Sequence, residues 1–489
     1  MTAVLALLGP MAVGFVVVTA LWPGRRRPDQ ALALKACLGG AWGVGIASWT
    51  FFLWLVLAGR PGPGLVVFEL AVFGLVLVAA VVVVRRQRPS LELPPRPLFG
   101  GLLPVALTLG FAAVLAVRGA EVVWFNQLLP HGEGDAYFIW NLKARFLYRG
   151  GDDWRLIFAF PSPDNEKIPL APPDYPLLVP ATVARLWWYA GVESTRVPAV
   201  VAGLATLGGV VLLWAVVTAV RGRSQGAIAG LALAATPFYF FLGSAQVADI
   251  PLAGYMLATV GLFVLHDATG RVDRRWIVLA GMLAGLAGWT KNEGLVFIAV
   301  LGAARLLVVP PRDGLRSAVR EAAAFLLGLL PVLGLLLYYR LELVPAMNYL
   351  LASQGDQTTL ERLQDASRYK TIFLRLLLQV LPLDSRTHWT SIGWLVLLAV
   401  PYRLLMGRNP NRVGHVTRTP LLIVVFMLLG YVFVYATTPL DLRGHLQSSL
   451  HRVLLHLWPL TLLWFFLSTA TPEETLAREA QPASEPPPA

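Results

Sequence analysis

Three aspartates stand at or just before the expected starts of helices, at Asp135, Asp174 and Asp249. Asp135 precedes a segment of helical periodicity that begins at Ala136, and Pro251 follows shortly after Asp249, which favours a helix start there. An aspartate at such a position can simply accept backbone N–H bonds as a helix cap. It can also serve as a general base that takes a proton from a hydroxyl or an amine. The residues alone leave both interpretations open.

Two short segments supply basic side chains that could balance these carboxylates. Lys291 lies in a turn beside Glu293, with which it could simply form an ion pair. The second segment runs from Asp441 to Arg452 and contains Arg443, His445, His451 and Arg452. Cations gathered in this way are suited to hold a phosphate or a carboxylate.

A metal-dependent chemistry is a weaker alternative. His131, Glu133 and Asp135 could form part of a divalent-cation site, whereas His445 and His451 are too far apart in the sequence for the usual helical metal pair. The single cysteine, Cys37, excludes a disulfide framework and a cysteine-based metal site. We therefore predict no cofactor, and we do not favour a divalent cation.

Composition places these residues in a membrane protein. Of the 489 residues, 56% are hydrophobic and 14% are charged, against roughly 25% charged in soluble domains. The net charge of +12 comes from 40 basic and 28 acidic residues. The basic residues form short clusters between long apolar runs, which is typical of polytopic membrane proteins and argues against a nucleic-acid partner.

Apolar stretches of sufficient length predict about thirteen transmembrane helices. They begin near Thr2, Leu32, Leu65, Leu98, Val197, Ala227, Ile250, Trp276, Leu295, Glu321, Ser391, Pro420 and Val453. Basic clusters, starting with Arg25–Arg27, occur in every second gap between these spans. We therefore predict that the N-terminus lies outside, that the C-terminus lies in the cytoplasm, and that the aspartates lie on the outer side.

The spans divide the chain into a transmembrane domain, residues 1–470, and a tail, residues 471–489, that is expected to be disordered in the cytoplasm. Two outer loops are long enough to fold, at 118–196 and 341–390. The first is expected to hold two amphipathic helices in the membrane interface. Trp187 and Trp188, in the second of these helices, are interpreted as part of an aromatic belt.

The order of the motifs resembles the GT-C superfamily of polytopic glycosyltransferases, which includes protein O-mannosyltransferases and aminoarabinose transferases. The resemblance is carried by four segments: Gly134-Asp135-Ala136, Asp174-Tyr175-Pro176-Leu177, Asp249-Ile250-Pro251 and Lys291-Asn292-Glu293-Gly294. Three spans precede the one that leads into the first long loop, whereas family members often place this loop after the first helix. The resemblance implies an all-α polytopic membrane protein with a GT-C-like bundle, in the plasma membrane of a bacterium.

The resemblance also implies roles for the residues. We expect transfer of a sugar, with inversion, from a polyprenyl-phosphate donor to a glycan, lipid or protein acceptor on the outer face of the membrane. Asp135 is the expected general base, with Asp249 as a second catalytic residue. The expected donor-phosphate ligands are Lys291, Arg443, Arg452 and His445, and the expected substrate contacts are Glu133, Asp174, Tyr175 and Glu293.

Two other functions remain open for a chain of this kind. A ligase or polymerase of lipid-linked glycans would use the same class of donor. A secondary transporter is less favoured, because transporters usually hold their ionisable residues near the bilayer midplane on interrupted helices.

Overall fold

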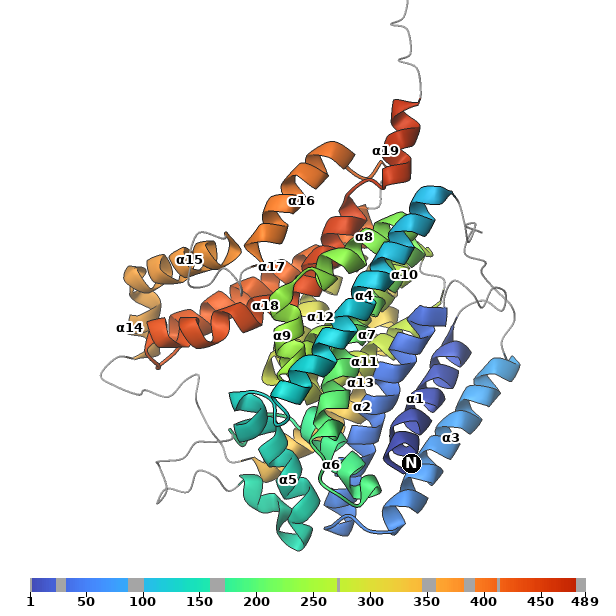
Figure 1. Cartoon of the computed structure of the whole chain (residues 1–489), viewed down its shortest axis with the longest axis vertical. Coiled ribbons are helices and arrows are strands. Elements are labelled where there is room, and N and C mark those ends of the chain that lie inside the picture. The colour runs from blue at the N-terminus through green and yellow to red at the C-terminus, as the bar shows by residue number, and fades with distance from the viewer. Residues whose placement is uncertain are drawn as a thin grey trace, which may run out of the picture.

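The computed structural model describes residues 2–22, 32–86, 101–158, 172–270, 273–344, 358–381, 392–410 and 414–480. These residues form a bundle of helices without a β-strand, in which the one isolated bridge pairs Arg408 with Thr469 (Figure 1). The prediction of an all-α polytopic membrane protein is confirmed. The predicted basic cluster at Arg25–Arg27 lies outside the described residues.

In the described part of the chain, ten helices are long and apolar enough to cross a membrane. They are α1 (Thr2–Leu21), α2 (Leu32–Ala58), α3 (Gly64–Arg86), α4 (Leu102–Leu128), α7 (Arg196–Arg221), α10 (Asp249–Ala268), α12 (Asn292–Asp313), α13 (Leu315–Tyr338), α17 (Gly414–Thr437) and α18 (Leu442–Ser468).

The three other predicted spans fall on shorter helices. The span expected from Ala227 is broken into α8 (Arg223–Ala234) and α9 (Pro237–Ser244), which meet at an angle of 64°. Pro237 explains the break, because proline has no N–H to continue the hydrogen-bond ladder and clashes with the preceding turn. The remaining two are α11 (Arg275–Thr290) and α16 (Gly393–Met406).

Shorter helices fill the first long loop between α4 and α7. They are a π-helical turn, η1 (Ala136–Trp140), then α5 (Asn141–Arg149), a 3₁₀ segment η2 (Gly151–Phe158) and α6 (Leu178–Ala190). The residues of α6 from Leu178 to Trp187 are all buried against the rest of the bundle, and the position of this helix in the membrane interface stays a prediction. Trp187 is a core residue that donates to the Ser194 carbonyl at 2.8 Å, rather than part of an aromatic belt.

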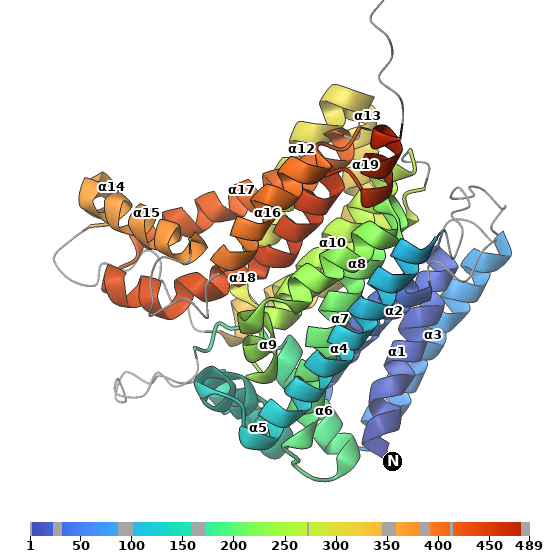
Figure 2. The same cartoon turned by 45° about the horizontal axis from the view of Figure 1, so that its top comes forward.

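The second long loop also contains helices. A π-helical turn, η3 (Tyr339–Leu343), continues α13, and α14 (Thr359–Gln364) and α15 (Ala366–Val380) follow. Figure 2 shows α14 and α15 beside the joined ends of α17 and α18. Arg368 of α15 fixes this arrangement, since its guanidinium donates to the carbonyls of Tyr435, Ala436 and Thr438 at 2.9–3.1 Å.

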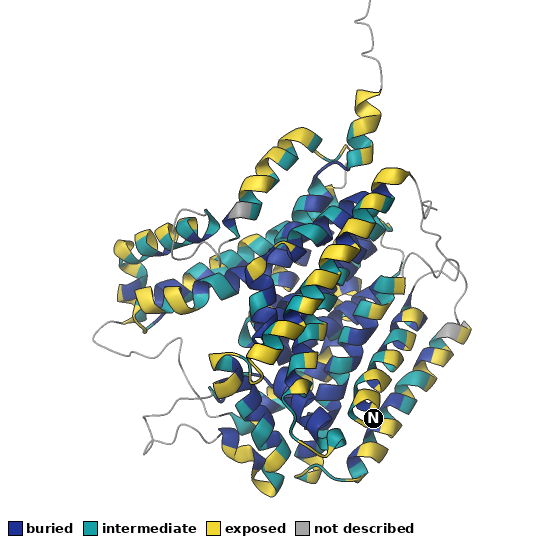
Figure 3. Ribbon diagram, in the orientation of Figure 1, coloured by how far each residue is buried: buried dark blue, intermediate teal, exposed yellow. Residues whose placement is uncertain are grey.

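Helix α10 lies at the centre of the bundle, where buried residues concentrate (Figure 3). It packs against α7, α11 and α18, and α11 in turn packs closely against α13. A side chain at Gly281 of α11 would meet the Phe325 carbonyl at 2.1 Å, and one at Gly328 of α13 would meet the Val278 carbonyl at 1.9 Å. Glycine at these positions lets the two helix backbones approach each other, as is common between membrane helices.

The two ends of the bundle differ in what they carry. The start of α1 and the loop helices α5 and α6 lie at one end, and the last helix, α19 (Pro472–Glu479), lies at the other (Figure 1). Because the chain starts at one end of the bundle and finishes at the other, it must cross the bundle an odd number of times, as the predicted thirteen spans require.

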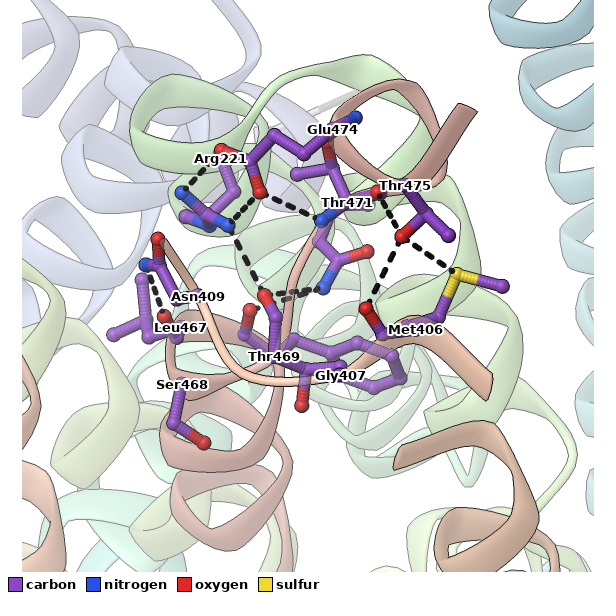
Figure 4. A network of polar contacts seen from close by, with 12 residues as sticks. Arg221, Met406, Gly407, Asn409, Leu467, Ser468, Thr469, Thr471, Glu474 and Thr475 are labelled. Atoms are coloured by element: carbon purple, nitrogen blue, oxygen red, sulfur yellow. Dashed lines mark hydrogen bonds and ion pairs between the residues drawn. The ribbon is translucent and has the colours of Figure 1, made fainter. Parts of the chain in front are cut away.

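The tail prediction is corrected for residues 472–479, which form α19. Thr471 and Glu474 make a capping box at its start. Glu474 also accepts from Arg221 at the end of α7 at 2.6 Å, and the same guanidinium donates to the Thr469 carbonyl at 3.0 Å (Figure 4). The sequence prediction missed this contact because the partner of Glu474 is distant in the chain. Residues 481–489 lie outside the described residues.

Candidate functional site

Asp249, the first residue of α10, is completely buried and is surrounded by three basic side chains. Its Oδ1 lies 3.2 Å from Lys291 Nζ and 2.8 Å from His456 Nε2. Arg452 Nη2 lies 2.7 Å from its Oδ2. A buried carboxylate is stable only when it is paired and fully hydrogen-bonded, and these three partners satisfy that requirement.

Asp135 occupies the exposed end of the same cluster. Arg452 Nη1 lies 2.5 Å from Asp135 Oδ2, so one guanidinium joins both aspartates. The Asp135 side chain is 38% exposed, whereas that of Asp249 is 0% exposed. The two carboxylates, both predicted to be catalytic, therefore differ in access to a substrate.

The helix-cap interpretation is wrong for both aspartates. Asp135 stands at the N-cap of η1 but makes no side-chain cap bond. Asp249 lies inside α10, whose N-cap residue is Ala248. Their carboxylates bind cations from distant helices, so neither residue is explained by local helix stability.

Lys291 forms the turn between α11 and α12 and contacts two carboxylates. Its Nζ lies 3.0 Å from Glu293 Oε1 as well as 3.2 Å from Asp249. Burial alone would lower the pKa of Lys291, but the charges of Asp249 and Glu293 raise it above its ordinary value. The side chain therefore remains an ammonium ion. The Lys291–Glu293 pair that the sequence suggested is present, but Lys291 also pairs with Asp249.

The Asp174–Tyr175 turn lies beside this cluster. Asn292, which follows Lys291, donates to Asp174 Oδ2 at 2.6 Å, and Arg340 Nη1 lies 3.7 Å from the same oxygen. The Tyr175 ring stacks on Trp140 with a centroid separation of 5.4 Å and an interplanar angle of 6°. Burial raises the pKa of Tyr175 to about 12, so its phenol stays protonated near neutral pH.

Lys143 of α5 stabilises this turn through hydrogen bonds to its backbone. The sequence analysis did not identify this residue. Its Nζ donates to the carbonyls of Tyr175 at 2.8 Å and Pro173 at 3.3 Å, and the Tyr339 hydroxyl donates to the same two carbonyls. Lys143 is 0% exposed, and burial lowers its pKa to about 7. In the sequence it was one cation among several on an amphipathic segment, so nothing marked it as buried.

His456 is the second residue that the sequence interpretation missed. It is 0% exposed and contacts Asp249 through Nε2, while its Nδ1 lies 3.5 Å from the Tyr431 hydroxyl. A usable signal was present, because residues four apart share a helix face and His456 stands four positions after Arg452 in α18. A histidine within an apolar span marks a buried polar contact.

Several predicted site residues lie away from the cluster. Arg443 is exposed in the first turn of α18 and makes no ion pair or hydrogen bond within the described chain. His445 contacts the Thr438 hydroxyl at 3.0 Å and stacks edge-on with Tyr435. Glu133 is exposed, and its backbone N–H donates to the Ala245 carbonyl at 3.2 Å.

No group of three or more His, Cys, Asp or Glu side chains among the described residues is arranged to hold a metal ion. The predicted alternative with His131, Glu133 and Asp135 therefore gains no geometric support. Chelation remains the test of metal dependence.

Together these contacts form a charged site at one end of a hydrophobic bundle. We call Asp135, Asp249, Lys291, Arg452 and His456 the aspartate cluster. It combines the solvent-accessible carboxylate of Asp135 with two cations, Lys291 and Arg452. The buried carboxylate of Asp249 holds both cations in place. Such a site can take a proton from one reactant and neutralise negative charge on another.

Residues 176–339 match a protein-family model described as dolichyl-phosphate-mannose-protein mannosyltransferase. The matched segment extends from the residue after Tyr175 to Tyr339, the first residue of η3, and includes Asp249, Lys291 and Glu293. Asp135 and Arg452 lie outside it. No curated protein and no solved structure matches the chain.

Proposed function

We propose that the chain is an integral-membrane glycosyltransferase that uses a polyprenyl-phosphate-linked sugar, with Asp135 as its general base, and the family match over residues 176–339 supports this class of activity. The observation that carries the proposal is the Arg452 guanidinium, which joins the accessible carboxylate of Asp135 to the buried carboxylate of Asp249. This contact holds Asp135 at the edge of a cationic site.

The proposed reaction is a single displacement. An acceptor hydroxyl or amine attacks the anomeric carbon of the sugar while Asp135 takes the proton from the attacking atom. The bond between that carbon and the phosphate oxygen breaks, and polyprenyl phosphate leaves with the electron pair. Attack opposite to the leaving group inverts the configuration at the anomeric carbon.

The leaving phosphate requires charge neutralisation more than protonation. Lys291 and Arg452 are the cations nearest to Asp135 and Asp249, and both are held by carboxylates before a donor arrives. We propose that they bind the donor phosphate. Preorganised charges of this kind do not have to reorient during the reaction, which is the origin of their catalytic effect.

Asp249 acts as a positioning residue in this scheme rather than as a proton acceptor. Its carboxylate is completely buried and fully occupied by Lys291, Arg452 and His456. We therefore replace the expected role of Asp249 as a second catalytic residue with an indirect one. Tyr175, Asp174 and Glu293 remain proposed substrate contacts, since they line the same region.

The remaining two cations of the sequence prediction, Arg443 and His445, are not proposed as ligands of the donor phosphate, because both lie away from the aspartate cluster. Arg443 lies roughly 13 Å from Arg452 along the axis of α18, by the helical rise between them. That separation is too long for both residues to hold one phosphate oxygen. Arg443 is therefore the natural control for the binding experiment.

The experiment that tests the function incubates the purified protein, in lipid nanodiscs, with a radiolabelled polyprenyl-phosphate sugar and candidate acceptors. Wild type is expected to release the label from the lipid, also after exhaustive chelation of divalent cations. Lys291→Met is expected to weaken donor binding about tenfold or more, whereas Arg443→Ala stays within about twofold.

Equal donor binding in the wild type and in Lys291→Met would contradict the phosphate assignment. Loss of activity on chelation would restore the metal-dependent alternative. A ligase or polymerase would move a preassembled glycan rather than a single sugar, and a transporter would leave the label on the lipid.

A further inference from the structure

Gln246 lies in the short break between α9 and α10, directly before the segment that carries Asp249. It is the one non-glycine residue with a positive φ among those described, at 61°. The left-handed conformation is unfavourable for a residue with a Cβ atom, so it persists only where the surroundings impose it. Gln246 is also almost completely buried.

The Gln246 side chain makes three hydrogen bonds that use both ends of its amide. Its Oε1 accepts from Asn141 Nδ2 at 3.1 Å. Its Nε2 donates to Asn126 Oδ1 at 3.0 Å and to the Pro130 carbonyl at 3.4 Å. Asn126 belongs to α4 and Asn141 begins α5, so these partners flank Asp135 on both sides. We call Asn126, Gln246 and Asn141 the amide clasp.

Backbone contacts bring the same two segments together beside the amide clasp. The Glu133 N–H donates to the Ala245 carbonyl at 3.2 Å. Gly132 has a φ of 72°, and a Cβ atom there would lie 2.6 Å from that carbonyl oxygen. The loop that carries Asp135 therefore rests directly on the residue before Gln246, and glycine is required for this close approach.

Arg452 cannot position Asp135 by itself. A guanidinium can bind two carboxylates only if both already lie within its reach, because its donors have a fixed planar geometry. Asp249 is fixed by burial, but Asp135 belongs to a partly exposed loop. Some other contact must set the distance between the loop and the start of α10.

We propose that Gln246 is a positioning residue whose amide clasp fixes the Asp135 loop against the start of α10, so that Arg452 can join the two aspartates. The proposal rests on the assignment of Asp135 as the general base. It explains why a strained conformation is found three residues before Asp249: in this conformation the amide reaches Asn126 of α4 and Asn141 of α5.

Three variants separate the amide from the backbone conformation. Gln246→Gly keeps the positive φ without strain but removes the amide. Gln246→Ala removes the amide and retains the strain. Gln246→Asn keeps both amide groups on a shorter side chain, and asparagine tolerates the left-handed region.

We expect both Gln246→Gly and Gln246→Ala to lower kcat by about 10- to 100-fold, with the donor KM within about twofold of wild type, because a displaced base affects the chemical step. Gln246→Asn is expected to recover a large part of kcat. Gln225→Ala is the matched control, since Gln225 is a buried glutamine that bonds carbonyls at the other end of the bundle, and its kcat should stay near wild type.

Wild-type kcat in Gln246→Gly would overturn the proposal, because the backbone conformation alone would then suffice. The same conclusion would follow if Gln246→Asn recovered nothing over Gln246→Gly.

Hydrogen–deuterium exchange provides a readout that does not depend on the reaction. Amides of residues 131–141 are expected to exchange faster in Gln246→Gly than in wild type, with Gln246→Asn in between. Unchanged exchange in Gln246→Gly would overturn the amide clasp whatever the enzyme does. Conversely, a wild-type protein that releases no sugar from any polyprenyl-phosphate donor would contradict the proposed function. The exchange experiment would still show whether the amide clasp fixes the loop.

Discussion

At the scale of single residues, burial determines what each charged group can do. Asp135 and Asp249 have the same side chain and share one arginine, yet 38% of the first side chain is exposed and none of the second. The exposed carboxylate can meet a substrate, whereas the buried one can only hold other side chains. The sequence identified both aspartates as catalytic candidates, but it could not show that one of them is buried.

Lys143 gives the clearest pH-dependent prediction at this scale. Burial lowers its pKa to about 7, against about 10.4 for an unperturbed lysine; the Asp174 charge raises the pKa and the Arg340 charge lowers it, both to a smaller extent. Between these values the unfolded chain holds a proton that folded Lys143 has released, so stability should increase as the pH rises from about 7 toward 10. Below pH 7 the unfavourable buried charge is fully present.

The measurement is the thermal midpoint of wild type and Lys143→Met between pH 6 and 10. Wild type is expected to gain stability over this range relative to the variant, whose Tyr339 hydroxyl still bonds both carbonyls of the turn. Parallel curves for the two proteins would show that Lys143 keeps its charge throughout.

At the scale of elements, helix α6 of the first loop is fixed by an ion pair to a membrane span. Arg185 of α6 binds both carboxylate oxygens of Glu69 in α3, at 2.6 and 2.7 Å, and also donates to the Ala6 carbonyl. Tyr189 donates to the same carboxylate at 2.7 Å. Both charged side chains are 5% exposed, so α6 is attached to the bundle by a buried pair.

Arg185→Met is expected to destabilise the protein by about 3–5 kcal/mol, because it leaves the Glu69 carboxylate buried without its partner. The double variant Arg185→Met with Glu69→Gln removes both charges and should recover most of that loss. Chemical unfolding in detergent measures the cycle. A double variant as unstable as the single one would show that packing, rather than charge, holds α6 in place.

Hydropathy predicted where the helices lie, and it failed where a tertiary contact or a proline decides the outcome. The stretch from Ala227 is apolar throughout, so the break at Pro237 was missed despite a visible proline. The tail after Thr471 has a polar composition, yet Arg221 holds helix α19 in place.

In the site, Asp135, Asp249, Lys291 and Arg452 were predicted together, because the side of the membrane can be deduced from charge. Lys143 and Gln246 were not, because their roles arise from burial, which no local pattern encodes. His456 was missed although its spacing from Arg452 offered a signal.

At the scale of the whole molecule, the aspartate cluster lies at one end of the bundle. The contact between Arg221 and Glu474 of α19 lies at the other end. Residues Asp249 and Asp267 mark the two ends of α10, and each belongs to its own buried ion network. Asp267 binds Arg305 of α12 at 2.6 Å, and Arg305 also binds Glu321 of α13 at 2.7 Å. The central helices are therefore joined by charges at both ends and by apolar packing between them.

The predicted orientation of the molecule can be tested with single cysteines. Cys37 is the chain's one cysteine, so a Cys37→Ser background lets a reporter be placed at will. Glu133→Cys, in the first loop, should react with a membrane-impermeant maleimide in intact cells. Glu479→Cys, at the end of α19, should react only after permeabilisation. The reverse labelling pattern would place the aspartate cluster on the cytoplasmic side.

The most direct test of the account is single-turnover transfer from a polyprenyl-phosphate sugar by Asp135→Asn, measured together with donor binding. The variant is expected to lose at least about 100-fold in rate with donor affinity within about threefold of wild type, because asparagine occupies the same space but cannot accept the proton. Glu133→Gln, an exposed carboxylate in the same loop, serves as the control and should retain its rate. Wild-type turnover in Asp135→Asn would contradict the assignment of the base.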